Sequence, residues 1–112
     1  MINTLTAVVA VFFGALGLAK LAAVAPMRAA AGHLGFTVNQ YRGLGVLEIG
    51  GAAGVALGLV FPPLGVASAA ALILMMVGAV ISHLKAGDFV QVAVPVVTAL
   101  IVAAYAIALV QG

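Results

Sequence analysis

The stretch LGVASAAALILMMVGAVISHL, residues 64–84, decides the fold, because it is almost wholly apolar and contains no aspartate, glutamate, lysine or arginine. A helix of about 20 apolar residues is long enough to cross about 30 Å of hydrocarbon. The stretch is too long for a strand, and polar and apolar residues do not alternate along it. It therefore predicts a transmembrane helix.

Three further apolar stretches have a similar length and character. Together with the first they give four expected spans, at residues 4–25, 43–61, 64–84 and 89–110. The first span begins without a lysine or arginine and is longer than a signal-peptide core, so we expect it to be retained. Only Pro62-Pro63 and a short polar turn at 85–88 separate the last three spans, which must be antiparallel neighbours. The sequence predicts an all-α, integral membrane four-helix bundle that forms a single domain over residues 1–112.

The composition supports this reading and excludes other classes of protein. Of the 112 residues, 67% are hydrophobic and 5% are charged, and the mean hydropathy is +1.42. A soluble domain carries about a quarter of its residues as charged side chains. The net charge of +2 comes from four basic and two acidic residues, too few for a nucleic-acid-binding surface. The chain has no cysteine, so it can supply neither disulfides nor thiol redox chemistry.

The segment between the first two spans, residues 26–42, mixes basic and polar side chains with apolar ones. This mixture suits a short helix that lies in the membrane interface or a loop folded over the mouth of the bundle, and we expect the interfacial segment. The alternating direction of the spans places Lys20, Arg28, Arg42 and Lys85 on one side of the membrane, with no lysine or arginine on the other. Cytoplasmic loops carry an excess of basic residues, so we expect this side to be cytoplasmic and both termini to face outward. The expected location is a bacterial cell membrane, crossed several times.

Three ionisable residues on three different spans lie at nearly the same depth. Lys20 and Glu48 are each about five residues, or about 8 Å, inside the charged end of their spans, and His83 is slightly shallower. An ionisable group in hydrocarbon is costly unless it is paired or wetted, and it often marks a functional site. We therefore expect Lys20 to pair with Glu48. The alternatives are that Lys20 extends to the lipid headgroups and that His83 is merely interfacial.

A seven-residue spacing extends this site along the helices. On the last span, Gln91, Thr98 and Tyr105 recur every seven residues, which keeps them within about 20° of one direction. Such faces point inward, either to hydrogen-bond between helices or to line a pocket for an amphipathic small molecule. The expected polar rim contains Lys20, Glu48, His83, Tyr41, Arg42 and Gln91. The expected apolar interior contains Phe13, Met76, Thr98 and Tyr105.

The glycines of the second span indicate tight helix packing. Gly50, Gly54 and Gly58 are four residues apart, and small residues at this spacing let another helix approach closely. The partner could be another helix of the chain or a second copy. No metal site is expected, because the spans offer one carboxylate and the two histidines are far apart in sequence.

Three motifs resemble those of a known family. Gly17-Leu-Ala-Lys20-Leu resembles the G-x-x-K-[LI] signature that closes the first span of the DoxX-like family of small four-helix membrane proteins. The run Gly45-Val-Leu-Glu48-Ile-Gly-Gly-Ala-Ala-Gly54 is similar to its G-x-x-E-x-x-G-x-x-G pattern in the second span. The run Gly78-Ala-Val-Ile-Ser-His83-Leu-Lys-Ala-Gly-Asp88 resembles the end of its third span, where a histidine precedes a polar turn.

The resemblance covers essentially the whole chain and carries over Lys20, Glu48 and His83 as the polar residues of the family pattern. It implies a four-helix bundle. The family takes its name from a subunit associated with thiosulfate:quinone oxidoreduction, and other relatives are linked to oxidative-stress complexes. The sequence itself names no cofactor.

Three functions fit these observations. The first is an accessory or ligand-handling subunit of a membrane redox system that binds a quinone-like or lipid-like molecule. Its expected partners are membrane lipid and either further copies of the chain or the other proteins of a membrane complex. The second is a small oligomeric transporter or channel-like protein that uses a buried Lys–Glu pair. The third is a small membrane enzyme with Glu48 and His83 as acid and base, although no nucleophile is recognisable.

Overall fold

The computed structural model describes residues 1–112 and contains only helices. The elements are α1 (Ile2–Leu21), α2 (Ala25–Leu34), α3 (Val38–Leu57), α4 (Pro62–Lys85), the 3₁₀ turn η1 (Val90–Val92) and α5 (Ala93–Gln111). There are thus five α-helices, one more than the four expected spans. The extra one is the short α2, which forms within the segment expected to lie in the interface.

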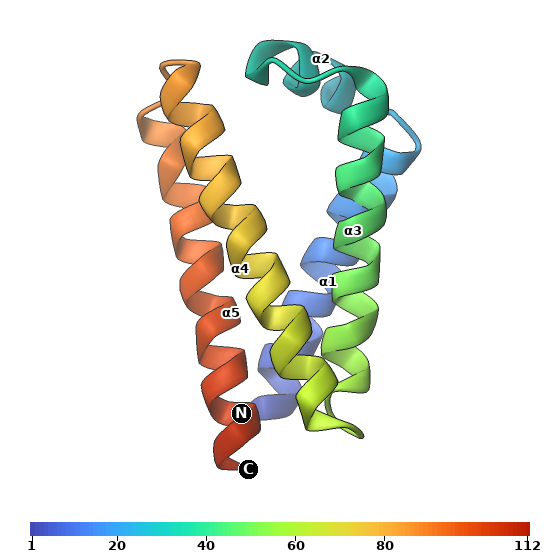
Figure 1. The fold of residues 1–112 in the computed structure, drawn as a ribbon, viewed down its shortest axis with the longest axis vertical. Coiled ribbons are helices and arrows are strands. Elements are labelled where there is room, and N and C mark those ends of the chain that lie inside the picture. Colours follow the sequence, from blue (N-terminus) through green and yellow to red (C-terminus); the bar gives the residue numbers. More distant parts are fainter.

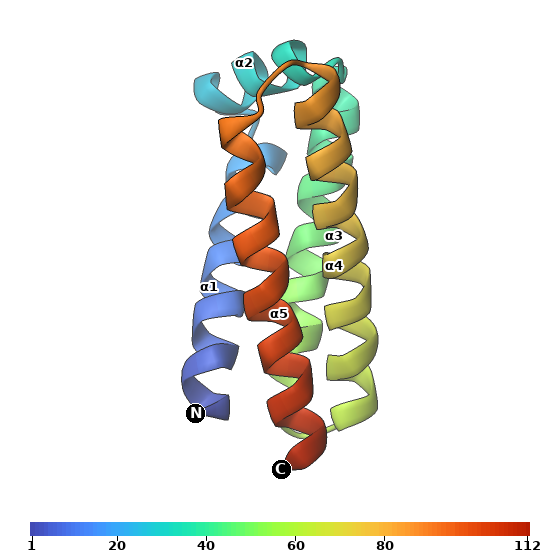
Figure 2. The same cartoon turned by 90° about the vertical axis from the view of Figure 1, so that its left-hand side faces the viewer.

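The four long helices form an antiparallel bundle of two pairs (Figure 1). Helix α1 packs most extensively against α3, and α4 packs against α5. The pairs converge at the end that holds both termini and diverge toward the other end, where α2 lies across the top of the bundle (Figures 1 and 2). We call these the closed end and the wide end.

Three helical segments are long and apolar enough to cross a membrane: Ile2–Leu21, Pro62–Lys85 and Val90–Gln111. The second expected span, residues 43–61, is shifted toward the N-terminus, because α3 begins at Val38 and ends at Leu57. Its first turns therefore contain polar residues, and it is not among the three segments that composition alone identifies. It nevertheless has 20 residues, as α1 does, and packs along α1.

The early start of α3 has a local cause. Thr37 accepts a hydrogen bond from the backbone N–H of Gln40 at 3.0 Å, and the Gln40 side chain accepts one from the N–H of Thr37 at 3.0 Å. This reciprocal capping box satisfies two N–H groups that would otherwise lack a partner at the start of the helix. The preceding helix α2 ends at Leu34, and its C-cap Gly35 has a φ of 86°, a left-handed conformation that favours glycine. The capping box and the glycine both lie before the apolar run. A start of α3 that is predicted from hydrophobicity alone therefore falls too late in the sequence.

Most large apolar side chains point outward rather than into the bundle. Only 18 of 112 residues are buried, and exposed valine, leucine, isoleucine and phenylalanine side chains occur on every long helix. A helix that is apolar on all sides is typical of a membrane span. The buried core lies where the helix pairs meet, and its largest fully buried members include Phe13, Leu72, Val55 and Tyr105.

Glycines bring the α3 and α4 backbones together at the closed end. A Cβ atom on Gly58 would lie 2.6 Å from the Gly65 Cα, and one on Gly54 would collide with the Ser68 hydroxyl. Gly50, which the sequence groups with them, faces open space, while Gly51 packs on Leu72. Within this chain Gly50 does not contact another helix, because a four-residue step turns by about 40°, so the two steps from Gly50 to Gly58 do not keep one face.

Candidate functional site

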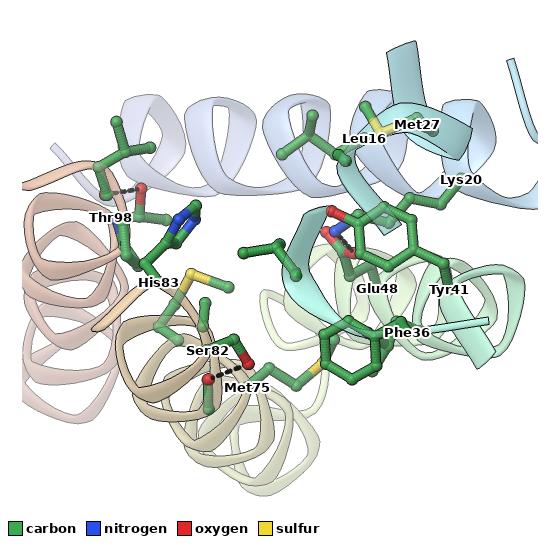
Figure 3. A pocket seen from close by; sticks show the side chains of 18 of the residues that line it. Leu16, Lys20, Met27, Phe36, Tyr41, Glu48, Met75, Ser82, His83 and Thr98 are labelled. Atoms are coloured by element: carbon green, nitrogen blue, oxygen red, sulfur yellow. Dashed lines mark hydrogen bonds and ion pairs between the residues drawn. The ribbon is translucent and has the colours of Figure 1, made fainter. Parts of the chain in front are cut away.

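A cavity of ≈ 410 Å³ opens between the helix pairs near the wide end. All five α-helices contribute to its wall, which is mostly apolar, and Figure 3 shows the side chains around it. Ligand pockets in proteins typically have volumes of about 300–1,000 Å³. The polar residues of the wall are Lys20, Tyr41, Glu48, Ser82, His83 and Thr98. The apolar part includes Phe12, Leu16, Met27, Phe36, Met75 and Met76.

Lys20 and Glu48 form a buried ion pair across the α1–α3 interface. The Lys20 Nζ donates to Glu48 Oε1; the Glu48 side chain is fully buried and that of Lys20 is 14% exposed. Side chains on a helix lean toward its N-terminus. Because α1 and α3 are antiparallel, Lys20 and Glu48 lean toward one another. The pairing expected from the sequence is therefore a consequence of their positions on opposite helices.

Two glycines one turn away make this pairing possible. A Cβ atom on Gly17 would lie 2.7 Å from the carbonyl oxygen of Gly45, and one on Gly45 would lie 2.6 Å from that of Gly17. A Cβ atom on Gly45 would also lie 2.8 Å from the Cβ of Lys20. The lysine stem thus passes over Gly45, where any larger residue would displace it. The glycines of the two sequence motifs hold the backbones close enough for the charges to meet.

The second carboxylate oxygen of Glu48 has no partner. Glu48 Oε2 is buried and makes no hydrogen bond, although the residue is part of the cavity wall. Nearby, the Lys20 Nζ lies 4.9 Å from the centroid of the Tyr41 ring, within range of a cation–π interaction. Tyr41 in turn packs against Phe36, with 5.9 Å between ring centroids. One wall of the cavity therefore combines an aromatic pair, an ammonium group and a free carboxylate oxygen.

His83 lies on a different wall, on α4, away from Glu48 (Figure 3). Its Nδ1 lies 3.0 Å from Asp88 Oδ2, and the Nε2 of His33 on α2 lies 2.7 Å from the same oxygen. The hydrogen bond from His83 is the largest cause that lowers the pKa of the Asp88 carboxyl below its usual range; desolvation opposes it, and a hydrogen bond from His33 lowers the pKa further. Asp88 thus ties α2 to the end of α4. The sequence analysis did not identify this contact, because His33 and Asp88 are 55 residues apart.

Several residues expected at the pocket lie elsewhere. Phe13 and Tyr105 are fully buried in the core and do not line the large cavity. Each lies seven residues, or about 10 Å, below a cavity residue on its own helix. The prediction that they line the cavity is wrong because both side chains lie below the level of the cavity. The prediction that they point into the bundle is correct. Met76 and Thr98 do line the cavity, but the Thr98 hydroxyl donates to its own helix, to the Val94 carbonyl at 2.7 Å.

Two members of the expected polar rim are also outside the cavity wall. Gln91 lies in η1 and is exposed. Arg42 is exposed as well, and its Nε donates to the Leu21 carbonyl at 2.9 Å, which joins the start of α3 to the end of α1. Arg42 therefore closes the last turn of α1 rather than facing a ligand.

The chain contains no group of three or more histidine, cysteine, aspartate or glutamate side chains that could hold a metal ion. The two histidines of the wide end share a single carboxylate oxygen, and Glu48 is engaged by Lys20 on another wall. The chemistry of the site is therefore that of hydrogen bonds, one buried ion pair and apolar contacts.

These features define a class: a small, all-helical membrane protein with a mostly apolar cavity that carries a few polar groups near one end of its bundle. The model of the DoxX-like family matches residues 4–105, which is nearly the whole chain. The chain belongs to the DoxX-like family. No curated protein and no solved structure matches it.

Proposed function

We propose that this DoxX-like protein is an accessory, ligand-handling subunit of a membrane redox system, and that its cavity binds a quinone-like or lipid-like small molecule. The observation that carries the proposal is the buried, unpartnered Oε2 of Glu48 in the wall of a largely apolar, ligand-sized cavity. The family name supports the redox setting by analogy only, since it comes from a subunit associated with quinone chemistry.

The free oxygen matters because burial without a partner is costly. A buried polar group with no hydrogen bond loses about 1–3 kcal/mol, and a charged group loses more. Among the buried side-chain atoms of the protein, Glu48 Oε2 is the one left in this condition. A ligand donor that displaces the side chains covering Oε2 would supply the missing partner and recover this loss.

The rest of the cavity suits an amphipathic molecule. The polar groups of Lys20 and Glu48 occupy one part of the wall, while Phe12, Leu16 and Met75 provide apolar surface. A ligand can place its head at the carboxylate and its apolar portion against these side chains. This division is typical of small-molecule sites, in which a few polar groups orient a mainly apolar ligand.

The transporter alternative has less support. A pathway through the bundle needs an opening through its core, but Phe13, Leu72 and Tyr105 are fully buried in that core, and glycine contacts join α3 to α4 at the closed end. The enzyme alternative has one favourable observation: Asp88 faces Nδ1 of His83, as in sites where a carboxylate orients a histidine. Without a recognisable nucleophile, this arrangement fits ligand binding equally well.

The proposal is tested by purifying the protein from its native membranes in mild detergent and identifying bound small molecules by native mass spectrometry. A variant that fills the cavity, Ala79→Phe, should lose the ligand, because Ala79 lines the wall. The matched control on the same helix is Leu74→Phe, at a side chain that is 70% exposed and faces outward. Equal ligand content in both variants would contradict a ligand site in the cavity.

The accessory role has its own readout. Cross-linking of intact membranes before purification should join the protein to a membrane redox enzyme, identified by its flavin, haem or iron–sulfur spectrum. Retention of a small molecule with no redox protein cross-linked would leave the ligand site standing and overturn the subunit role.

A further inference from the structure

We infer that the cavity selects ligands by the direction of one hydrogen bond: it takes a ring-bearing head that donates an O–H, such as a phenol or hydroquinone, in preference to the corresponding carbonyl form. The inference rests on the proposed function and specifies the ligand class of that same site. It depends on which hydrogen bonds the Glu48 carboxylate can make in its surroundings.

The unpartnered atom of the site is an acceptor. Lys20 donates its ammonium N–H to Oε1, so the two side chains form an ion pair of an ammonium and a carboxylate group. An ionised carboxylate accepts hydrogen bonds and donates none. Oε2 is therefore completed only by a donor, and an O–H to a carboxylate makes a short, charge-assisted hydrogen bond.

A carbonyl head meets the opposite situation. Its lone pairs would face those of Oε2, which is repulsive. Lys20 Nζ contacts Oε1 and lies 4.9 Å from the centroid of the Tyr41 ring, and it keeps two further N–H groups from which a carbonyl could accept. A carbonyl held in this way would still leave Oε2 without a partner, whereas an O–H group completes it, so the site prefers a donor.

The neighbouring side chains favour a flat ring next to that donor. Phe36 and Tyr41 form a tilted aromatic pair with 5.9 Å between centroids. Met75 and Met76 belong to the facing part of the wall on α4. Aromatic rings pack well against other rings and against thioether sulfur. An aromatic head with an apolar tail therefore matches the wall better than a branched or highly polar headgroup.

The experiment compares three probes with the same decyl tail: the hydroquinone, the benzoquinone and the 1,4-dimethoxybenzene. Binding to the purified full-length protein in lipid nanodiscs is measured by equilibrium dialysis, with the hydroquinone kept reduced under argon. We expect the hydroquinone to bind at least about tenfold more tightly than the other two, the size of effect that a hydrogen bond to a charged group produces. The dimethyl ether has the same ring and no O–H, so it isolates the contribution of the donor.

A single substitution should reverse the preference. In Glu48→Gln the amide oxygen can still accept from Lys20, which turns the amide N–H toward the cavity as a donor. The variant should therefore prefer the quinone to the hydroquinone. Circular dichroism and gel filtration establish whether the variant is folded; if it is not, the three-probe series on the unmodified protein still decides.

The possible outcomes separate this inference from the function on which it rests. If the quinone binds the unmodified protein as tightly as the hydroquinone, the donor preference is wrong while the ligand site remains. If none of the three probes binds, the proposed site itself fails. If the hydroquinone is preferred but Glu48→Gln keeps that preference, another residue provides the selection and the assignment to Glu48 is overturned.

Discussion

The two ends of the bundle differ in whether their buried polar groups have hydrogen-bond partners. At the closed end, the fully buried Tyr105 donates its hydroxyl to the Val55 carbonyl at 2.6 Å. At the cavity near the wide end, the equally buried Glu48 leaves one oxygen without any partner. The first arrangement is complete and holds helices together. The second is incomplete, and completing it requires something from outside the chain.

The difference follows from how closely the helices approach. Gly58 and Gly65 let α3 and α4 meet backbone to backbone, so the Tyr105 side chain, whose hydroxyl lies next to both glycines, has close neighbours. Toward the wide end the pairs diverge (Figure 1), and on α4 a Cβ atom added at Gly78 would meet no atom within 4 Å. Tight packing fixes a structure, whereas looser packing leaves room for a ligand.

The largest expected effect comes from breaking the ion pair at the cavity. Lys20→Met leaves the Glu48 carboxylate buried without its cation, and we expect a loss of about 3–5 kcal/mol in unfolding free energy. The double variant Lys20→Met/Glu48→Met should recover much of this loss, because it removes both charges. Unfolding in detergent followed by circular dichroism measures the cycle, and strictly additive effects would show that the two side chains do not interact.

A matched pair of glycine substitutions on α4 tests the contrast between the two ends directly. Gly65→Ala should destabilise the protein by about 1–3 kcal/mol, because the new Cβ would lie 2.8 Å from the Gly58 Cα and 2.6 Å from a Leu109 methyl carbon. Gly78→Ala should be neutral or stabilising by up to about 1 kcal/mol, since alanine favours the helix and meets no neighbour. The same denaturation assay applies, and effects of equal sign would remove the contrast.

The hydrogen bond of the closed end gives a smaller expected effect. Tyr105→Phe keeps the ring in the core and removes only the hydroxyl that donates to Val55. We expect a loss of about 1–2 kcal/mol in unfolding free energy and no change in ligand content, because Tyr105 does not line the large cavity. A loss of ligand without a loss of stability would place Tyr105 at the site instead.

The smallest expected effect concerns pH and the tie between α2 and α4. The pKa of Asp88 is lowered by hydrogen bonds from His83 and His33, so its stabilising contribution is complete above the ordinary aspartate pKa and is lost as the pH falls through the lowered value. Hydrogen exchange of residues 25–34, corrected for intrinsic rates, should therefore increase as the medium is acidified below about pH 4. Asp88→Asn should raise this exchange already at neutral pH and reduce its dependence on acid.

Much of the fold was predictable because hydrocarbon imposes strong rules. Apolar stretches of sufficient length identified the long helices, and the same reasoning singled out Lys20 and Glu48, since unpaired charges in lipid are costly. The start of α3 was missed because a capping box, not hydropathy, determines it. The second span therefore begins earlier than expected, and the count of helices rises to five because α2 forms in the segment before it.

Two of the errors at the site have the same physical origin. A seven-residue repeat identifies a face of a helix but not the depth at which a cavity ends, so Phe13 and Tyr105 were assigned to the pocket rather than to the core beneath it. The bridge through Asp88 depends on how α2 crosses the wide end, which no local pattern encodes. The family resemblance was correct, and the model of the DoxX-like family covers the same motifs.

The contact between Gly17 and Gly45 limits how this molecule can change shape. With their backbones touching, α1 and α3 cannot slide past one another without a steric clash, so they form a rigid unit. A rotation of this unit against α4 and α5, with the Gly58–Gly65 contact as its pivot, is one motion that would enlarge or close the cavity. Such a rotation would alter the width between the two pairs while the Lys20–Glu48 charges stay together.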